Sequence, residues 1–178
     1  NTAREEHAGA GTQTAALTFG GKSGSATANT ETWNGSSWTE VADLNTARQE
    51  LTGDGATNTA SIAIGGAADK AVVETWNGTS WTEVADANTS RRLCAGVGSG
   101  NSDALVFGGD TNPSPYTVNT ETWDGTSWTE GNDLNTGRRF PGGAGTNAEA
   151  VLAFGGRVPP STNHKLTESY NGTSWTEV

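Results

Sequence analysis

Residues 74–84 read ETWNGTSWTEV, a short polar stretch in which two tryptophans flank an Asn-Gly pair. Nearly the same letters return as ETWNGSSWTEV at 31–41, ETWDGTSWTEG at 121–131 and ESYNGTSWTEV at 168–178. The stretch is therefore one part of a repeating unit, and the fold depends on what each unit does with its aromatic pair.

The Asn-Gly pair predicts a β-hairpin. It is typical of a type I′ turn, because both central residues of that turn take positive φ. With Asn77 and Gly78 as a two-residue loop, Trp76 pairs with Thr79, and both Trp76 and Trp81 project from one face. A lone hairpin does not bury two indoles, so we expect a neighbouring unit to pack against that face.

The repeat covers the whole 178-residue chain. Each unit begins with Asn-Thr-x-Arg, continues through a Gly/Ala-rich segment and an apolar run ending in Gly-Gly, and finishes with the tryptophan hairpin. The four units are residues 1–44, 45–87, 88–134 and 135–178. Gly-Gly recurs at 20, 65, 108 and 155, and steps of 43 to 47 residues fit the blades of a β-propeller.

Four strands are expected in each unit. The first is a Gly/Ala-rich segment such as HAGAG at 7–11, the second an apolar run such as AALTFGG at 15–21, and the last two are the arms of the hairpin. Apolar residues do not recur at helical spacing for more than a turn, so no helix is expected. The segments 22–30, 67–73, 110–120 and 157–167 absorb nearly all differences in length, which indicates loops on one face.

Composition narrows the classes of function. Twenty acidic and ten basic residues give a net charge of -10, which disfavours binding to nucleic acid or to anionic membranes. No apolar run approaches the roughly 18 residues of a membrane-spanning helix. The single cysteine, Cys94, excludes an internal disulfide. Because the sequence contains no methionine, we expect it to be a piece of a longer or processed product.

The Gly-Gly doublet, the aromatic that follows about ten to fourteen residues later and the tryptophan five residues beyond it resemble the kelch repeat over the entire chain. The resemblance implies a β-propeller with four-stranded blades, the first strand innermost and Gly-Gly at the end of the second. The phrase WNGTSWTEVADLNTAR also resembles uniform kelch-like arrays of marine bacteriophages and bacteria. That likeness implies a surface or tail-associated role, outside a cell or on a virion.

Four repeats are fewer than the five to seven common in kelch propellers. Three arrangements fit the sequence: a closed four-bladed ring, a fragment of a longer array, and two chains that join into an eight-bladed ring. Four blades are sufficient to close a propeller. The Gly/Ala-rich inner strands permit the close approach to the axis that such a ring demands.

Four arginines recur in the connections between units, at Arg4, Arg48, Arg91 and Arg138. On the loop face, a ring of guanidinium groups would bind carboxylates, sulfates or phosphates. Glutamates recur with the same period at Glu31, Glu74, Glu121 and Glu168, so the alternative is a structural Arg–Glu pair in each unit.

The variable loops provide the other candidate binding residues, because binding side chains concentrate on loops carried by a rigid scaffold. These candidates are Lys22, Asp69, Lys70, Asp110, Tyr116, Arg157, His164 and Lys165. Tyr116 is the strongest single candidate, since it lies among prolines and away from the packing positions. The alternative is that these loops are unconstrained connectors.

Catalysis is not expected from this sequence. His7 and His164 are the only histidines, and they show no spacing typical of metal ligands. Cys94 has no evident histidine partner, and no cofactor motif is present. Sequons occur at Asn34, Asn77, Asn88 and Asn171, but turn geometry already accounts for the hairpin asparagines.

The sequence thus predicts a non-enzymatic binding propeller whose loop face engages a glycan or a protein. The alternative prediction is an assembly element of a fibre, filament or virion protein. In that alternative the repeats contact copies of themselves, as a homo-oligomer or as part of a longer array.

Overall fold

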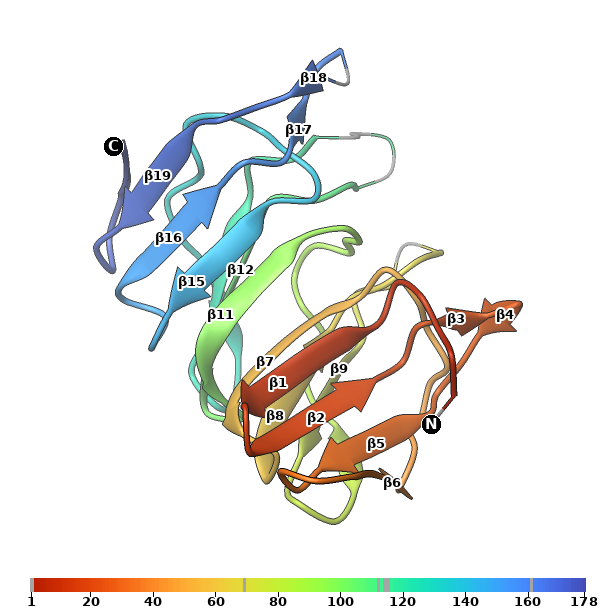
Figure 1. Cartoon of the computed structure of the whole chain (residues 1–178). Helices are drawn as coiled ribbons and strands as arrows, with labels where there is room; N and C mark the ends of the chain where they lie inside the picture. The colour runs from red at the N-terminus through yellow and green to blue at the C-terminus, as the bar shows by residue number, and fades with distance from the viewer. Residues whose placement is uncertain (1, 69, 112, 114–115, 161) are drawn as a thin grey trace.

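The computed structural model describes every residue except 1, 69, 112, 114, 115 and 161. The described chain is all-β and forms four four-stranded antiparallel sheets, with no helix among these residues. One sheet lies in each repeat unit, and the sheets follow one another around an arc (Figure 1).

The four sheets share one strand order, in which the chain crosses from the inner to the outer edge. The first sheet contains β1 (Ala8–Thr12), β2 (Ala15–Phe19), β5 (Thr30–Trp33) and β6 (Trp38–Val41). The second contains β7 (Thr52–Thr57), β8 (Ala60–Ile64), β9 (Val73–Trp76) and β10 (Trp81–Glu83). The third contains β11 (Ala95–Gly100), β12 (Asp103–Phe107), β13 (Thr120–Trp123) and β14 (Trp128–Glu130). The fourth contains β15 (Gly142–Gly145), β16 (Val151–Phe154), β19 (Thr167–Tyr170) and β20 (Trp175–Glu177).

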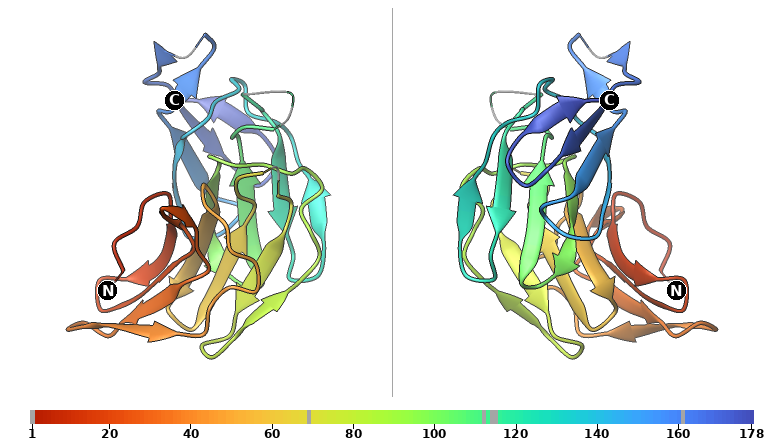
Figure 2. Two further views of the ribbon diagram at one scale, coloured as in Figure 1. Left: turned by 90° about the vertical axis from the view of Figure 1, so that its right-hand side faces the viewer. Right: turned by 90° about the vertical axis from the view of Figure 1, so that its left-hand side faces the viewer.

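Two small hairpins extend the loops that follow the Gly-Gly doublets. β3 (Lys22–Ser23) pairs with β4 (Ser25–Ala26), and β17 (Arg157–Val158) pairs with β18 (Thr162–Asn163). The β17–β18 hairpin projects beyond the sheet from which it arises, as both views of Figure 2 show. Both hairpins lie in segments that the sequence identified as variable loops, although it gave no sign of strand pairing there.

The tryptophan hairpins confirm that both aromatics lie on one face, but the predicted register is wrong. Trp76 pairs with Trp81, not with Thr79, so the connection contains the four residues 77–80. Oδ1 of Asn77 accepts hydrogen bonds from the backbone N–H groups of Thr79 and Ser80, at 2.9 Å each. This side-chain cap stabilises a longer loop, in which only the glycine takes positive φ.

The core consists of three apolar clusters, one between each pair of neighbouring sheets. In the first cluster the Trp81 ring meets the Phe19 ring edge-on, with ring centroids 4.9 Å apart. In the third, Trp175 meets Phe107 in the same way at 5.0 Å. In the second, third and fourth sheets the second hairpin tryptophan therefore packs against the second strand of the preceding sheet, which confirms for these sheets the expected packing against a neighbouring unit.

Of the three arrangements that fit the sequence, the closed ring of four sheets is not formed by the described residues. β1 lies against β7, β7 against β11 and β11 against β15, but the fourth sheet does not return to the first (Figure 1). Leu152 and Phe154 on the outer face of the fourth sheet are each 43% exposed, whereas Leu17 and Phe19 at the equivalent positions are 0–1% exposed. The side chains between sheets set the angle at each interface, and no local sequence signal specifies whether four such angles complete a turn.

Candidate binding surface

The recurring arginines form buried ion pairs with the recurring glutamates. Arg48 donates from Nη2 to Oε1 of Glu74 at 3.0 Å, and Arg4 donates likewise to Glu31 at 3.1 Å. Arg91 pairs with Glu121 and Arg138 with Glu168 in the same way. Arg48, Arg91 and Arg138 are at most 1% exposed, so their guanidinium groups are not available to a ligand at the surface.

Each pair lies in a network that belongs to its own repeat. The backbone N–H and side-chain amide of Asn45 donate to Oε2 of Glu74, at 2.7 and 2.9 Å. Nη1 of Arg48 donates to the carbonyl oxygen of Gly65, the first glycine of the positive-φ Gly-Gly doublet, at 3.2 Å. Burial lowers the pKa of Arg48, and the Glu74 carboxylate opposes that shift. The Asn-Thr-x-Arg and Glu-Thr-Trp motifs are thus two halves of one structural anchor.

A series of backbone hydrogen bonds links the connections that precede the first strands of the four sheets, on the loop face. We call the place where these connections meet the mouth. Glu50 N–H donates to the carbonyl oxygen of Glu6 at 3.0 Å, Leu93 N–H to that of Glu50 at 3.0 Å, and Phe140 N–H to that of Leu93 at 2.8 Å. All four residues take positive φ between 52° and 57°. A cavity of about 310 Å³ lies where these connections meet, and residues from all four repeats line it.

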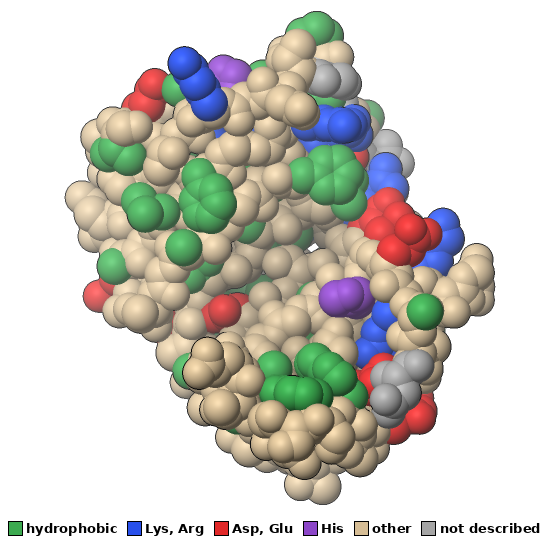
Figure 3. All heavy atoms as spheres, in the orientation of Figure 1, with side chains coloured by type: hydrophobic (Ala, Val, Ile, Leu, Met, Phe, Trp, Pro, Cys, Tyr) green, Lys and Arg blue, Asp and Glu red, His purple; other side chains and the backbone are tan. Residues whose placement is uncertain are grey.

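Charged side chains cross this mouth from sheet to sheet. Arg92 binds Glu50 of the preceding repeat at 2.8 Å and Asp110 of its own repeat at 3.6 Å. Arg139 of the fourth repeat reaches the same Asp110 at 3.3 Å. Asp110 is therefore a buried carboxylate held between two guanidinium groups. In Figure 3 basic and acidic side chains gather along the right-hand edge, which is the loop side.

Aromatic and cationic groups meet beside Asp110. The Arg139 guanidinium lies over the Tyr116 ring at 5.2 Å and near the Phe140 ring at 5.7 Å, while Arg157 approaches Phe140 at 5.9 Å. Phe140 is 51% exposed, and a hollow of about 430 Å³ is lined by Phe140, Gly156, Arg157, Asn163 and His164. We call Asp110, Tyr116, Arg139, Phe140, Arg157 and His164 the rim cluster.

Three polar atoms of the rim cluster are buried without a hydrogen-bond partner in the described part of the chain. They are Asp110 Oδ1, Arg139 Nε and His164 Nδ1. Buried polar atoms are normally satisfied by protein, water or a ligand. Of these three residues His164 lines the hollow, so the unused hydrogen-bonding capacity of its Nδ1 lies there.

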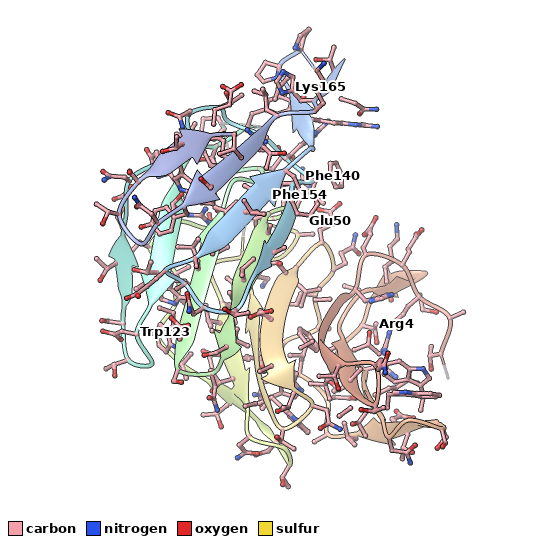
Figure 4. The ribbon with its side chains drawn as sticks, turned by 60° about the vertical axis from the view of Figure 1, so that its left-hand side comes forward. Arg4, Glu50, Trp123, Phe140, Phe154 and Lys165 are labelled. Carbon is pink, nitrogen blue, oxygen red and sulfur yellow. The ribbon has the colours of Figure 1, made fainter. Side chains whose placement is uncertain are left out.

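The structure brings some of the sequence-derived candidates together and separates others. Asp110, Tyr116, Arg157 and His164 belong to the rim cluster, and the exposed Lys165 follows directly (Figure 4). Lys22 lies instead in the β3–β4 hairpin of the first repeat, 3.9 Å from Glu5, and Lys70 is half-buried in the second repeat. Asp69 lies outside the described residues.

Sequence reasoning missed Arg92, Arg139 and Phe140. The available signal was the Arg-Arg doublet that ends the connection in the third and fourth repeats only, as RRL at 91–93 and RRF at 138–140. The first arginine of each doublet forms the buried ion pair, and the second extends to the mouth. Phe140 stands where the other repeats have Glu6, Glu50 and Leu93.

A second hollow lies on the open face of the first sheet. Its volume is about 690 Å³, and its lining includes Arg4, Gly9, Trp38 and, from the second sheet, Asp54. Burial raises the pKa of Asp54 to about 6, against hydrogen bonds from the backbone of Gly55 and Gly98 that lower it. In Figure 3 hydrophobic side chains gather on both sides of the hollowed centre.

His7 and Cys94, the two residues considered for chemistry, directly precede the first strands of their sheets, β1 and β11. Nδ1 of His7 lies 3.2 Å from the Thr18 hydroxyl on the first sheet. The apolar surroundings of Cys94 raise the pKa of its thiol to about 11, so a reactive thiolate is scarce at neutral pH. Across the residues that the structure describes, no group of three or more His, Cys, Asp or Glu side chains is arranged to hold a metal ion.

No family model matches this chain, and no curated protein matches it either. The kelch resemblance thus stays a prediction from the repeated motifs. No helix long and apolar enough to cross a membrane occurs among the described residues.

Proposed function

We propose that the chain is part of a kelch-like β-propeller and acts as a non-enzymatic binding module, displayed outside a cell or on a virion. Its loop face presents the rim cluster to an anionic glycan. The observation that carries this proposal is the half-exposed Phe140 beside two guanidinium groups, at a hollow that is also lined by His164, whose Nδ1 has no hydrogen-bond partner among the described residues.

The chemistry of the rim cluster fits a sugar that carries a carboxylate or a sulfate. The apolar face of a sugar ring packs against an exposed aromatic ring such as Phe140. Arg157 binds an anionic substituent through its fork of N–H donors, and the exposed Lys165, which follows His164 in the chain, adds a second positive charge to the same repeat. The net charge of -10 slows the approach of a polyanion, so recognition depends on these local contacts.

Equilibrium titration with defined oligosaccharides tests the proposal. A sulfated and a uronate oligosaccharide are compared with a neutral glucan of the same length. We expect binding of an anionic oligosaccharide, no binding of the neutral one, and at least about tenfold weaker binding for Arg157→Ala. Lys22→Ala is the matched control, because Lys22 occupies the position after Gly-Gly in the first repeat. Equal losses for both variants, or binding of acidic proteins only, would contradict the glycan proposal.

A second candidate function is assembly with copies of the same repeat. The described large hydrophobic side chains that are exposed are Trp38, Phe140, Leu152, Phe154 and Val178. Trp38 belongs to the first sheet and the other four to the last repeat, so these side chains gather at the two ends of the arc. An element that only binds ligands at its loop face has no need for two apolar end faces.

A further inference from the structure

The two end faces of the arc carry the two halves of the interface that already joins its sheets. The three internal interfaces follow one rule. The second strand of one sheet presents two large apolar side chains, such as Leu17 and Phe19, and the next sheet covers them with a glycine and the second hairpin tryptophan. A Cβ on Gly53 would come 2.4 Å from Phe19, and one on Gly143 would come 3.2 Å from Phe107.

The fourth sheet carries the two large apolar side chains of this interface, but no following sheet covers them. Leu152 and Phe154 point away from the third sheet, because Val151 and Ala153 occupy the buried face of the same strand. Figure 4 shows Phe154 on β16, Phe140 in the connection before β15, and Arg4 of the first repeat across the opening. Val178 is 73% exposed, whereas its equivalents Val41 and Val84 pack against the internal clusters.

The first sheet has the covering half. Gly9 stands at the position of Gly53 and Gly143, and a Cβ there would meet only one carbonyl oxygen, at 3.4 Å. Trp38 is 37% exposed, compared with 6–8% for Trp81, Trp128 and Trp175. The hollow of about 690 Å³ lies on this face.

The polar groups at the two ends also match. The hydrogen-bond chain through residues 6, 50, 93 and 140 begins at Glu6 and ends at the carbonyl of Phe140, so the next bond in the series joins Glu6 N–H to that carbonyl. Trp81 and Trp175 donate to Thr30 and Thr120, and Thr167 occupies the same position on the fourth sheet.

The charges at the two ends are complementary. At the internal interface between the third and fourth sheets, Asp110 after Gly-Gly binds Arg139 of the next repeat. The corresponding residues at the ends are Arg157 of the fourth repeat and Glu5 of the first. Glu5 already lies 3.9 Å from Lys22, and Arg157 forms no ion pair among the residues described. An ion pair between Arg157 of one copy and Glu5 of the next would thus repeat the Asp110–Arg139 ion pair, with the positive and negative positions exchanged.

We propose that the fourth sheet of one chain packs head-to-tail against the first sheet of a second copy, through the same interface that joins the sheets inside the chain. Gly9 and Trp38 of one copy cover Leu152 and Phe154 of the other. Two such junctions place eight sheets around one axis, within the four to eight blades that propellers contain. An interface between unlike faces closes into a ring when its rotation completes a turn.

Measuring the mass in solution is the first test. Light scattering and native mass spectrometry over a concentration series should give twice the 18.2 kDa of one chain, or a larger multiple if the ring stays open. Phe154→Asn should weaken association at least about tenfold and leave the single chain folded, because the side chain is already half-exposed there. Thr82→Asn, on the exposed outer strand of the second sheet, is the control. A chain that stays monomeric at high concentration overturns the proposal, as does association that Phe154→Asn leaves unchanged.

A pair of glycine variants separates association from folding. Gly53→Ala should destabilise the chain itself, because the added Cβ clashes with Phe19 inside a formed interface. Gly9→Ala should leave unfolding of the single chain unchanged but weaken association, because Phe154 of the other copy occupies that space. A Gly9→Ala variant that unfolds more easily than the native chain but associates normally would contradict the assignment of Gly9.

A charge exchange tests the orientation of the junction. Arg157→Glu and Glu5→Arg should each weaken association, and the double variant should recover it. Cysteines at positions 6 and 140 should form a disulfide between chains only when both variants are present. A disulfide formed by Phe140→Cys alone would show that like faces meet and would overturn the head-to-tail arrangement. These readouts do not use a glycan, so their failure is distinct from failure of the proposed binding function.

Discussion

The indole Nε1 of Trp81 donates a hydrogen bond to the hydroxyl of Thr30 on the preceding sheet, at 3.1 Å in a fully buried setting. Trp175 and Thr120 form the same bond at 3.1 Å. The middle interface differs, because Val73 occupies the threonine position and Trp128 donates instead to the carbonyl oxygen of Ala85. Each second tryptophan thus combines apolar packing with one polar contact across an interface.

Removing the Thr30 hydroxyl, which accepts the hydrogen bond from Trp81, should destabilise the chain. We expect Thr30→Val to lower the free energy of unfolding by about 1–3 kcal/mol, because the buried indole N–H of Trp81 loses its partner while the side-chain shape is kept. Denaturant titration followed by tryptophan fluorescence measures the change. Thr167→Val is the matched control, and it should not affect the unfolding of a single chain. Equal effects of both substitutions would show that the hydrogen bond is not the cause.

Substitutions in the buried Arg–Glu anchors should lower the free energy of unfolding more than substitutions of charged residues at the surface. Glu121 accepts from the backbone N–H groups of Asn88 and Thr89 as well as from Arg91. We expect Glu121→Gln to cost about 3–5 kcal/mol of unfolding free energy, because it leaves the Arg91 guanidinium buried beside a neutral group. Glu130→Gln, at an exposed position on the partner strand, should change it by less than about 0.5 kcal/mol. Similar losses in the two variants would argue against a specific anchor.

Asp54 should make stability depend on pH near neutrality. Because the pKa of Asp54 is raised to about 6 from the ordinary value of 3.8, folding favours its protonated form. That stabilisation is fully present below pH 3.8 and is lost as the pH rises through about 6. Asp54→Asn should therefore unfold at a higher temperature than the native chain at pH 7.5, and the difference should shrink near pH 4. A difference that is constant from pH 4 to 8 would exclude titration of Asp54 as its origin.

The rim cluster should lose its ligand when its aromatic group is removed. Phe140→Ala should weaken binding of an anionic oligosaccharide by about tenfold, and binding should weaken further as salt is raised, because the Arg157 contact is exposed. Isothermal titration at two salt concentrations measures both effects. Phe154→Ala changes the other exposed phenylalanine of the same repeat, which lies on β16 and not in the rim cluster, and it should bind normally. Loss of binding in both variants would place the contact elsewhere.

The repeated motifs were sufficient to predict the strands of each unit, but not whether the four sheets close into a ring. Gly-Gly, Trp-Asn-Gly and Asn-Thr-x-Arg each act within one repeat, so the sequence predicted four strands per unit and the Arg–Glu alternative. The turn length was wrong because the Asn77 side chain, and not the backbone type alone, determines the loop. Closure depends on the angles between sheets, which arise from side chains far apart in sequence, such as Phe19 and Trp81.

The candidate site was predicted only in part for a similar reason. Asp110, Tyr116, Arg157 and His164 were found because they lie in loops of variable length. Arg139 and Phe140 were missed because they belong to a constant part of the repeat. Their role depends on contacts between the third and fourth repeats, such as Arg139 with Asp110, and the sequence of a single repeat does not reveal such contacts.

Because Asn45, Arg48 and Glu74 all come from one repeat, the charged interior of each sheet is complete before any neighbour arrives. Duplication or deletion of a unit of about 45 residues in the gene would therefore leave the buried Arg–Glu anchors of the other units undisturbed. Such a molecule is suited to changing its number of units over evolutionary time, while the loops diverge independently of the scaffold that supports them.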